Sequence, residues 1–116
     1  MITQLSDPAD PVLDIGFTGT VTAEDYAAVL APALERGRER IRMRATFGEG
    51  FRGYSSGAMI ADARLGLRHW RDFARVAVVS DVPWLRWSVA AFAPLVPCEI
   101  KLFHLAERDS ARDWLG

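Results

Sequence analysis

The fold of this chain is decided by the stretch FARVAVVSD at residues 73–81. Its centre, residues 76–79, is a short continuous apolar run, which is typical of a central parallel strand covered on both faces. Asp81 is a suitable cap for a helix that begins near Pro83, because proline is tolerated in the first helical turn. The stretch therefore predicts a buried strand that leads directly into a helix.

The alternation of strand and helix continues on both sides of this stretch, because the hydrophobic period changes repeatedly between about 2 and about 3.6 residues. Strands are predicted at residues 2–5, 12–18, 41–47, 76–79 and 100–105, and helices at residues 22–37, 56–70, 83–96 and 107–115. The order is β(β)αβαβαβα, in which helical crossovers join parallel strands. We expect one α/β domain over residues 1–116, with a sheet of four to five mostly parallel strands and four helices.

The helix that begins at Thr22 carries the clearest signals. Thr22 is a good N-cap, and Glu24 and Asp25 lie in the positive first turn. Tyr26 begins an apolar face at helical spacing, and Pro32 inside this pattern predicts a kink. Gly37 suits the end of the helix.

The next two segments predict how the sheet is bordered and covered. Residues 41–47 alternate apolar side chains with Arg42, Arg44 and Thr46, which indicates one dry and one wet face and therefore an edge strand. The glycine-rich residues 48–57 predict a loop. The helix that follows is expected to turn four side chains inward, namely Met59, Ala63, Leu67 and Trp70.

Composition excludes several classes of protein. Half of the 116 residues are apolar, which argues against disorder, and the net charge of −1 gives no general attraction to nucleic acid or to an anionic membrane. Cys98 is the only cysteine, so an intramolecular disulfide and a multi-cysteine zinc site are excluded. The first residues show no signal peptide, and the longest apolar stretch, residues 88–98, is too short to span a membrane. We therefore expect a cytoplasmic protein.

Four segments in this order carry a resemblance to a known family. They are GTVTAEDY at residues 19–26, FRG at residues 51–53 with Asp62 further along, the 73–81 stretch with Trp84, and Ala111 with Trp114-Leu115. Together they resemble the SpoIIAA-like family, mostly uncharacterised bacterial proteins. The resemblance covers nearly the whole chain and implies the fold that STAS domains share with the lipid-binding SEC14/CRAL-TRIO domains. It implies little about function, because a fold does not specify one.

Ser55 and Ser56 are the candidates for a regulatory phosphosite. The segment YSSG at residues 54–57 is similar in place to the motif that a kinase phosphorylates in bacterial anti-sigma-factor antagonists, although Tyr54 stands where those proteins have Asp. A phosphate there would lie at the helix N-terminus and would change the local charge by nearly two units. The favoured alternative is that Ser56 is an ordinary N-cap.

A second apolar stripe on the helix near Pro83 indicates an interface or a pocket. Trp84, Trp87, Ala91 and Leu95 follow helical spacing beside the core face, and a helix that is apolar on two sides is buried on two sides. A subunit interface, which predicts a homodimer, or the wall of an apolar pocket would explain this stripe. Simple core packing explains it equally well.

No set of residues predicts catalysis, a metal or a cofactor. Asp62 and His69 are about 10 Å apart along one helix, which is too far for a general-base pair or a shared metal. We expect Asp62 instead to accept a hydrogen bond from a loop backbone. We expect Cys98 to be a small buried residue rather than a nucleophile. His104 has no obvious acid that would orient it for catalysis. We expect the basic run from Arg36 to Arg44 to face solvent at the end of a helix and along the edge of a strand.

Three classes of function follow, in order of preference. The first is a non-catalytic binding or regulatory module that acts through contacts with an unidentified protein partner, including a second copy of itself. The alternative is a binding protein for a small apolar, lipid-like ligand, with a cavity near Tyr26, Met59, Trp84 and Phe92. It ranks second because a lipid-sized cavity would remove much of the core of so small a domain. An enzyme ranks third, since the chain lacks a convergent acid, base and nucleophile.

Overall fold

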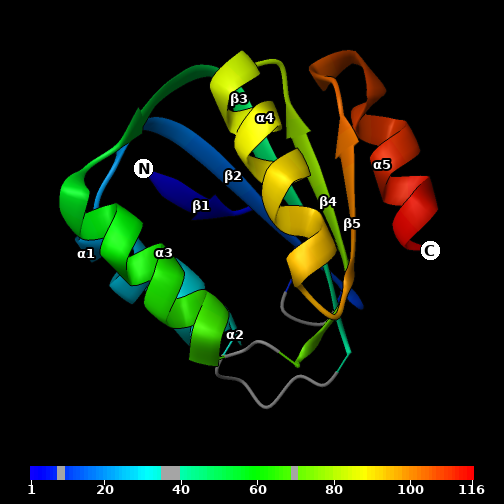
Figure 1. Cartoon of the computed structure of the whole chain (residues 1–116), viewed down its shortest axis with the longest axis horizontal. Helices are drawn as coiled ribbons and strands as arrows, with labels where there is room; N and C mark the ends of the chain where they lie inside the picture. Colours follow the sequence, from blue (N-terminus) through cyan, green and yellow to red (C-terminus); the bar gives the residue numbers. More distant parts are fainter. Residues whose placement is uncertain (8–9, 35–39, 69–70) are drawn as a thin grey trace.

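The computed structural model describes residues 1–7, 10–34, 40–68 and 71–116. The strands are β1 (Ile2–Gln4), β2 (Val12–Val21), β3 (Ile41–Tyr54), β4 (Phe73–Ser80) and β5 (Glu99–Phe103). The first helix is built from α1 (Ala23–Asp25), η1 (Tyr26–Leu30) and α2 (Ala31–Leu34), and α3 (Ser56–Arg68) and α4 (Pro83–Phe92) follow it. The chain continues with η2 (Ala93–Leu95), η3 (Leu105–Glu107) and α5 (Arg108–Leu115). The predicted order of strands and helices is confirmed (Figure 1).

The strands form one mixed sheet in the order β1-β2-β3-β4-β5. β1 is antiparallel to β2, and the other neighbouring pairs are parallel, as the helical crossovers require. The strand β4, which lies inside the sheet between β3 and β5, is covered on both faces, as predicted. Val76 and Val78 pack in a core with the first helix, α3 and α4, whereas Ala77 and Val79 pack against α5 on the opposite face.

The prediction that residues 41–47 form an edge strand is wrong, because β3 lies between β2 and β4. The arginines on its polar face are not solvated but bonded to the protein. Arg42 Nη1 donates to the carbonyl oxygens of Leu115 and Gly116, and Arg44 Nη1 donates to the carbonyl of Arg108, so both side chains hold α5. The glycine-rich segment is not a separate loop either, since β3 continues along β2 to Tyr54 through register shifts.

Thr22 is the N-cap of the first helix, as predicted, and it also forms a capping box with Asp25. Thr22 Oγ1 accepts from the Asp25 backbone N–H, and the Asp25 carboxylate accepts from the Thr22 N–H. The π-helical turn η1 lies just before Pro32, where a kink was expected, and such single π turns are frequent at functional sites. Gly37 lies outside the described residues.

The inward face of α3 differs from the prediction. Met59 and Ala63 are exposed, whereas Ala58 is fully buried; the Leu67 side chain and Trp70 fall outside the described part of the chain. The reason is that α3 packs closely on α1, where a Cβ placed on Gly57 would approach the Ala23 Cβ to 3.3 Å. Asp81 does not cap α4 either, since Val82 is its N-cap and Asp81 accepts from the Leu105 N–H instead.

Candidate functional site

An open, apolar groove of about 470 Å³ lies between α3 and α4 on one face of the sheet. We call it the α3–α4 groove. Its floor is formed by strand residues, chiefly Phe17, Met43, Phe47, Val76, Val78 and Ile100. Its walls are formed by Met59, Asp62 and Leu65 from α3, and by Trp84, Leu85, Ser88, Val89 and Phe92 from α4.

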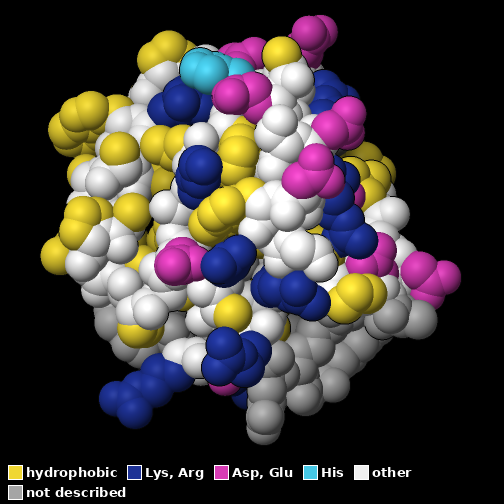
Figure 2. Space-filling model, turned by 90° about the vertical axis from the view of Figure 1, so that its right-hand side faces the viewer, with side chains coloured by type: hydrophobic (Ala, Val, Ile, Leu, Met, Phe, Trp, Pro, Cys, Tyr) yellow, Lys and Arg dark blue, Asp and Glu magenta, His cyan; other side chains and the backbone are white. Residues whose placement is uncertain are grey.

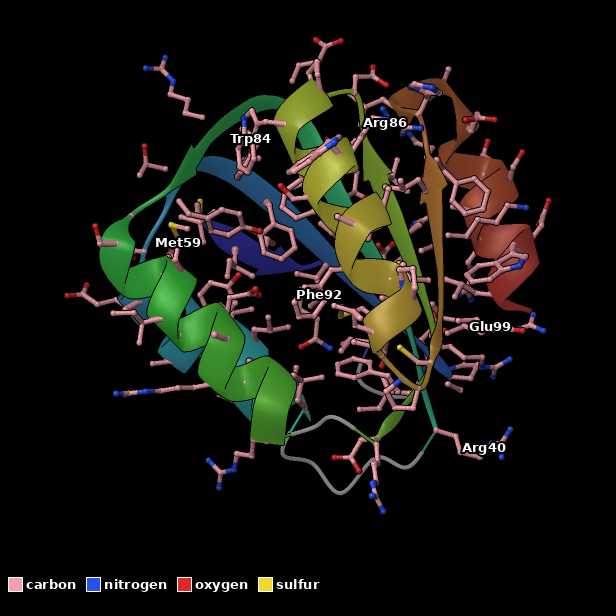
Figure 3. All side chains as sticks on the ribbon, viewed as in Figure 1. Arg40, Met59, Trp84, Arg86, Phe92 and Glu99 are labelled. Carbon is pink, nitrogen blue, oxygen red and sulfur yellow. The ribbon has the colours of Figure 1, made fainter. Side chains whose placement is uncertain are left out.

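Large apolar side chains stand exposed on the rim of this groove. Figure 3 shows Met59 reaching from α3, and Trp84 and Phe92 from α4, toward the space between the two helices. Met59 is 64%, Trp84 51% and Phe92 58% exposed. Exposed apolar side chains are normal singly, but a contiguous set around a concavity is typical of a binding surface.

An aromatic cluster closes one end of the groove. Phe17 stacks on Phe47 with ring centroids 4.3 Å apart, and Phe47 meets the edge of Tyr54 at 6.3 Å. Tyr54 in turn meets Trp84 at 6.4 Å, which connects β3 to α4. Such packed rings provide a rigid apolar wall at little entropic cost.

Asp62 is the one charged residue among the described residues that line the groove. Its Oδ1 accepts a hydrogen bond of 2.9 Å from the hydroxyl of Tyr26, rather than from a loop backbone as predicted. Water reaches this carboxylate, but the surrounding protein replaces much of the bulk solvent, which raises the pKa of Asp62, while the Tyr26 hydrogen bond lowers it.

The two neighbouring phenols stay protonated. Burial raises the pKa of Tyr26 far above its ordinary value, and the negative charge of Asp62 and the proximity of Tyr54 add to this effect. Burial and the same negative charge also raise the pKa of Tyr54. Tyr26 is therefore a permanent donor that orients Asp62 from behind the wall of the groove.

The remaining polar groups of the groove are neutral. The Ser88 hydroxyl donates to the Trp84 carbonyl at 2.7 Å within α4. Cys98 lines the groove, and burial raises the pKa of its thiol, so the sulfur is protonated and a weak nucleophile.

Ser55, not Ser56, provides the cap of α3. Ser55 Oγ accepts from the Ala58 backbone N–H at 3.1 Å, which satisfies one of the free donors of the first turn. Ser56 is the exposed first residue of the helix. Phosphorylation of either serine stays a prediction.

Trp87 on α4 and Leu95 at the end of η2 are exposed and do not line the groove. Trp87 is 75% exposed, so simple core packing does not explain this side chain. Hydrophobic side chains protrude along the left edge of Figure 2, on the side where α4 lies. Of the predicted stripe, Trp84 therefore lines the groove, whereas Trp87 and Leu95 lie outside it.

His104 has an acidic partner that the sequence did not suggest. Its Nδ1 lies 3.0 Å from Asp81 Oδ1, and both side chains are exposed at the end of the sheet. Cys98 lines the groove and His104 does not, so the groove does not bring these two residues together. His69 lies outside the described residues. Within the described ranges, three or more His, Cys, Asp or Glu side chains nowhere gather in a way that would hold a metal ion.

Part of the basic run contributes to a second depression, of about 650 Å³, at the other end of the strands. Four arginines line this depression, namely Arg40, Arg42, Arg71 and Arg75. Figure 2 shows Lys and Arg side chains down the middle of the side of the molecule that it views. Arg42 and Arg75 already donate to backbone carbonyls of the C-terminal segment, so their main role is to hold α5.

Comparisons with known proteins place this chain in one family. A sequence model of the SpoIIAA-like family matches residues 12–116. The crystal structure of an uncharacterised Shewanella loihica protein, from the DUF3478 family and with a SpoIIAA-like fold, is 25% identical with a TM-score of 0.75, and the match covers 100% of this chain and 93% of that one. No curated protein matches the chain. None of the described helices has the length and apolarity needed to cross a membrane.

Proposed function

This chain belongs to the SpoIIAA-like family, and from that premise we propose that it is a non-catalytic binding domain whose α3–α4 groove takes a small apolar molecule. The observation that carries the proposal is the groove itself, whose lining is almost wholly apolar and whose rim exposes Met59, Trp84 and Phe92 to water. A ligand in the groove would cover these side chains and gain the free energy of their burial.

The size of the groove suits this proposal. Its volume of about 470 Å³ lies within the range of pockets that bind small molecules. From the sequence alone this function ranks second, because a cavity inside so small a core would be costly. The groove instead lies beside an intact core, in which Leu13, Ile15 and Val79 are fully buried.

Adjacent residues on α3 offer a sharp test. Met59 lines the groove, whereas Ile60, with a similar exposed fraction of 57%, does not. We would titrate the protein with the neutral probe N-phenyl-1-naphthylamine and follow its fluorescence. The proposal expects saturable binding with one site per chain, weakened by Met59→Ser and unchanged by Ile60→Ser. Absence of saturable binding, or equal effects of the two substitutions, would overturn it.

A second candidate function is self-association through α4 and η2, favoured by the exposure of Trp87 and Leu95 outside the groove. Two copies that bury these stripes against each other would form a homodimer, the commonest closed assembly. Sedimentation at micromolar concentration tests this candidate. A dimer mass that becomes a monomer mass in Trp87→Ser supports it, and a monomer mass for the unchanged protein defeats it. A different protein partner and a cytoplasmic location stay predictions.

A further inference from the structure

The polarity of the α3–α4 groove is concentrated at one point. In the described part of the chain, Asp62 is its sole charged lining residue, and the hydrogen bond from Tyr26 is the sole one that the carboxylate accepts. The Tyr26 bond uses Oδ1, which leaves Oδ2 available to a bound molecule.

No described Lys, Arg or His lines the groove to neutralise this carboxylate. The arginine of α4, Arg86, donates from its Nη1 to the carbonyls of Ser80 and Phe103 at the ends of two strands. Arg64 follows Asp62 by two residues on α3, and residues at that spacing do not share a helix face. The raised pKa of Asp62 is consistent with this arrangement, since the surrounding protein replaces part of the solvent around the carboxylate and no described cation offsets that effect.

Aromatic faces add to the preference for positive charge. Tyr54 lies close enough to Asp62 for the carboxylate to raise its pKa, and its ring contacts Trp84 across the end of the groove. A carboxylate beside aromatic rings is the combination that recognises alkylammonium groups, because the ring faces attract cations.

We infer that the ligand of the α3–α4 groove is an apolar amine, whose ammonium group pairs with Asp62 while its hydrocarbon part lies between α3 and α4. This inference rests on the proposed function of the groove. An apolar carboxylate such as a fatty acid is disfavoured, because its head would meet a like charge with no described cation in between.

Three ligands of equal chain length test the inference: octylamine, octanol and octanoate, each titrated calorimetrically at neutral pH. We expect octylamine to bind about tenfold or more tightly than octanoate, with octanol between them. Asp62→Asn should bring octylamine and octanoate to similar affinities and leave octanol nearly unchanged. Asp109→Asn, the same charge change on α5, should behave like the unchanged protein. Circular dichroism checks that each variant is folded.

The outcomes separate the two proposals. Equal binding of all three ligands, or an octylamine preference that survives Asp62→Asn, overturns the inference and leaves apolar binding in place. If none of the three binds, both the inference and the proposed function fail.

Discussion

The hydroxyl of Tyr26 donates a 2.9 Å hydrogen bond to Asp62 Oδ1, and this contact joins the first helix to the wall of the groove. The Tyr26 ring is buried in the core, while the carboxylate that it orients faces the groove. The groove-facing carboxylate is thus positioned by a residue that does not itself line the groove.

Removal of this donor should raise the pKa of Asp62 further, because the Tyr26 hydrogen bond lowers it. Tyr26→Phe is expected to show this rise in a carbon-13 NMR titration of the carboxyl group, and to lose about 1 kcal/mol of stability. Tyr54→Phe is the matched control, since its hydroxyl makes no described hydrogen bond to Asp62. Equal shifts of the Asp62 pKa in the two variants would contradict the geometry described above.

The raised pKa of Asp62 also predicts how stability depends on pH. A carboxyl whose pKa is higher in the folded than in the unfolded state binds more protons when the protein is folded. Its contribution to the free energy of unfolding therefore falls as the pH rises from the unfolded-state pKa through the folded-state pKa. Asp62→Asn removes this loss and keeps an acceptor for Tyr26. Urea unfolding should therefore show the variant to be more stable than the unchanged protein at neutral pH, with a gain that shrinks toward pH values below the ordinary carboxyl pKa. A gain that does not depend on pH would count against the assignment.

The order of strands and helices was predictable because the hydrophobic period distinguishes strands, such as the apolar centre of β4, from helices, and because Thr22 marks the start of the first helix. The position of β3 in the interior of the sheet was not predictable. Arg42 and Arg44 look solvated in the sequence, since their partners are carbonyls of α5 that lie 73 and 64 residues further along the chain.

The groove could be recognised only in part. Tyr26, Met59, Trp84 and Phe92 were candidate pocket residues, and all of them except Tyr26 line the groove. The role of Asp62 was missed, because its partner Tyr26 lies 36 residues earlier, and no local pattern indicates a bond over that separation. The useful signal was a lone acid within an otherwise apolar helix face.

The cap of α3 gives a test of local structure at the two serines. Ser55→Ala should lose about 1 kcal/mol in urea unfolding, because the Ala58 N–H loses its acceptor. Ser56→Ala, at the exposed neighbouring position, should change stability by less than about 0.5 kcal/mol. If the larger loss follows the change at Ser56, that residue is the cap after all.

Arg44 on the central strand should matter more to stability than any exposed arginine. Its guanidinium pairs with Asp14 through two nitrogens, with the Nε bond at 3.1 Å, and also donates to the Arg108 carbonyl at 3.0 Å, so that one side chain ties β3 to β2 and to α5. The side chains of Arg44 and Asp14 are 17% and 14% exposed, and removal of one partner leaves a poorly solvated charge.

We therefore expect Arg44→Ala to lose about 2 kcal/mol in urea unfolding, and Arg44→Lys to recover only part of it, because lysine cannot form the two-pronged pair. Arg64→Ala, on the exposed surface of α3, is the control and should change stability by less than about 0.5 kcal/mol. Similar losses at Arg44 and Arg64 would mean that the polar face of β3 is solvated after all and that α5 is held by its apolar residues alone.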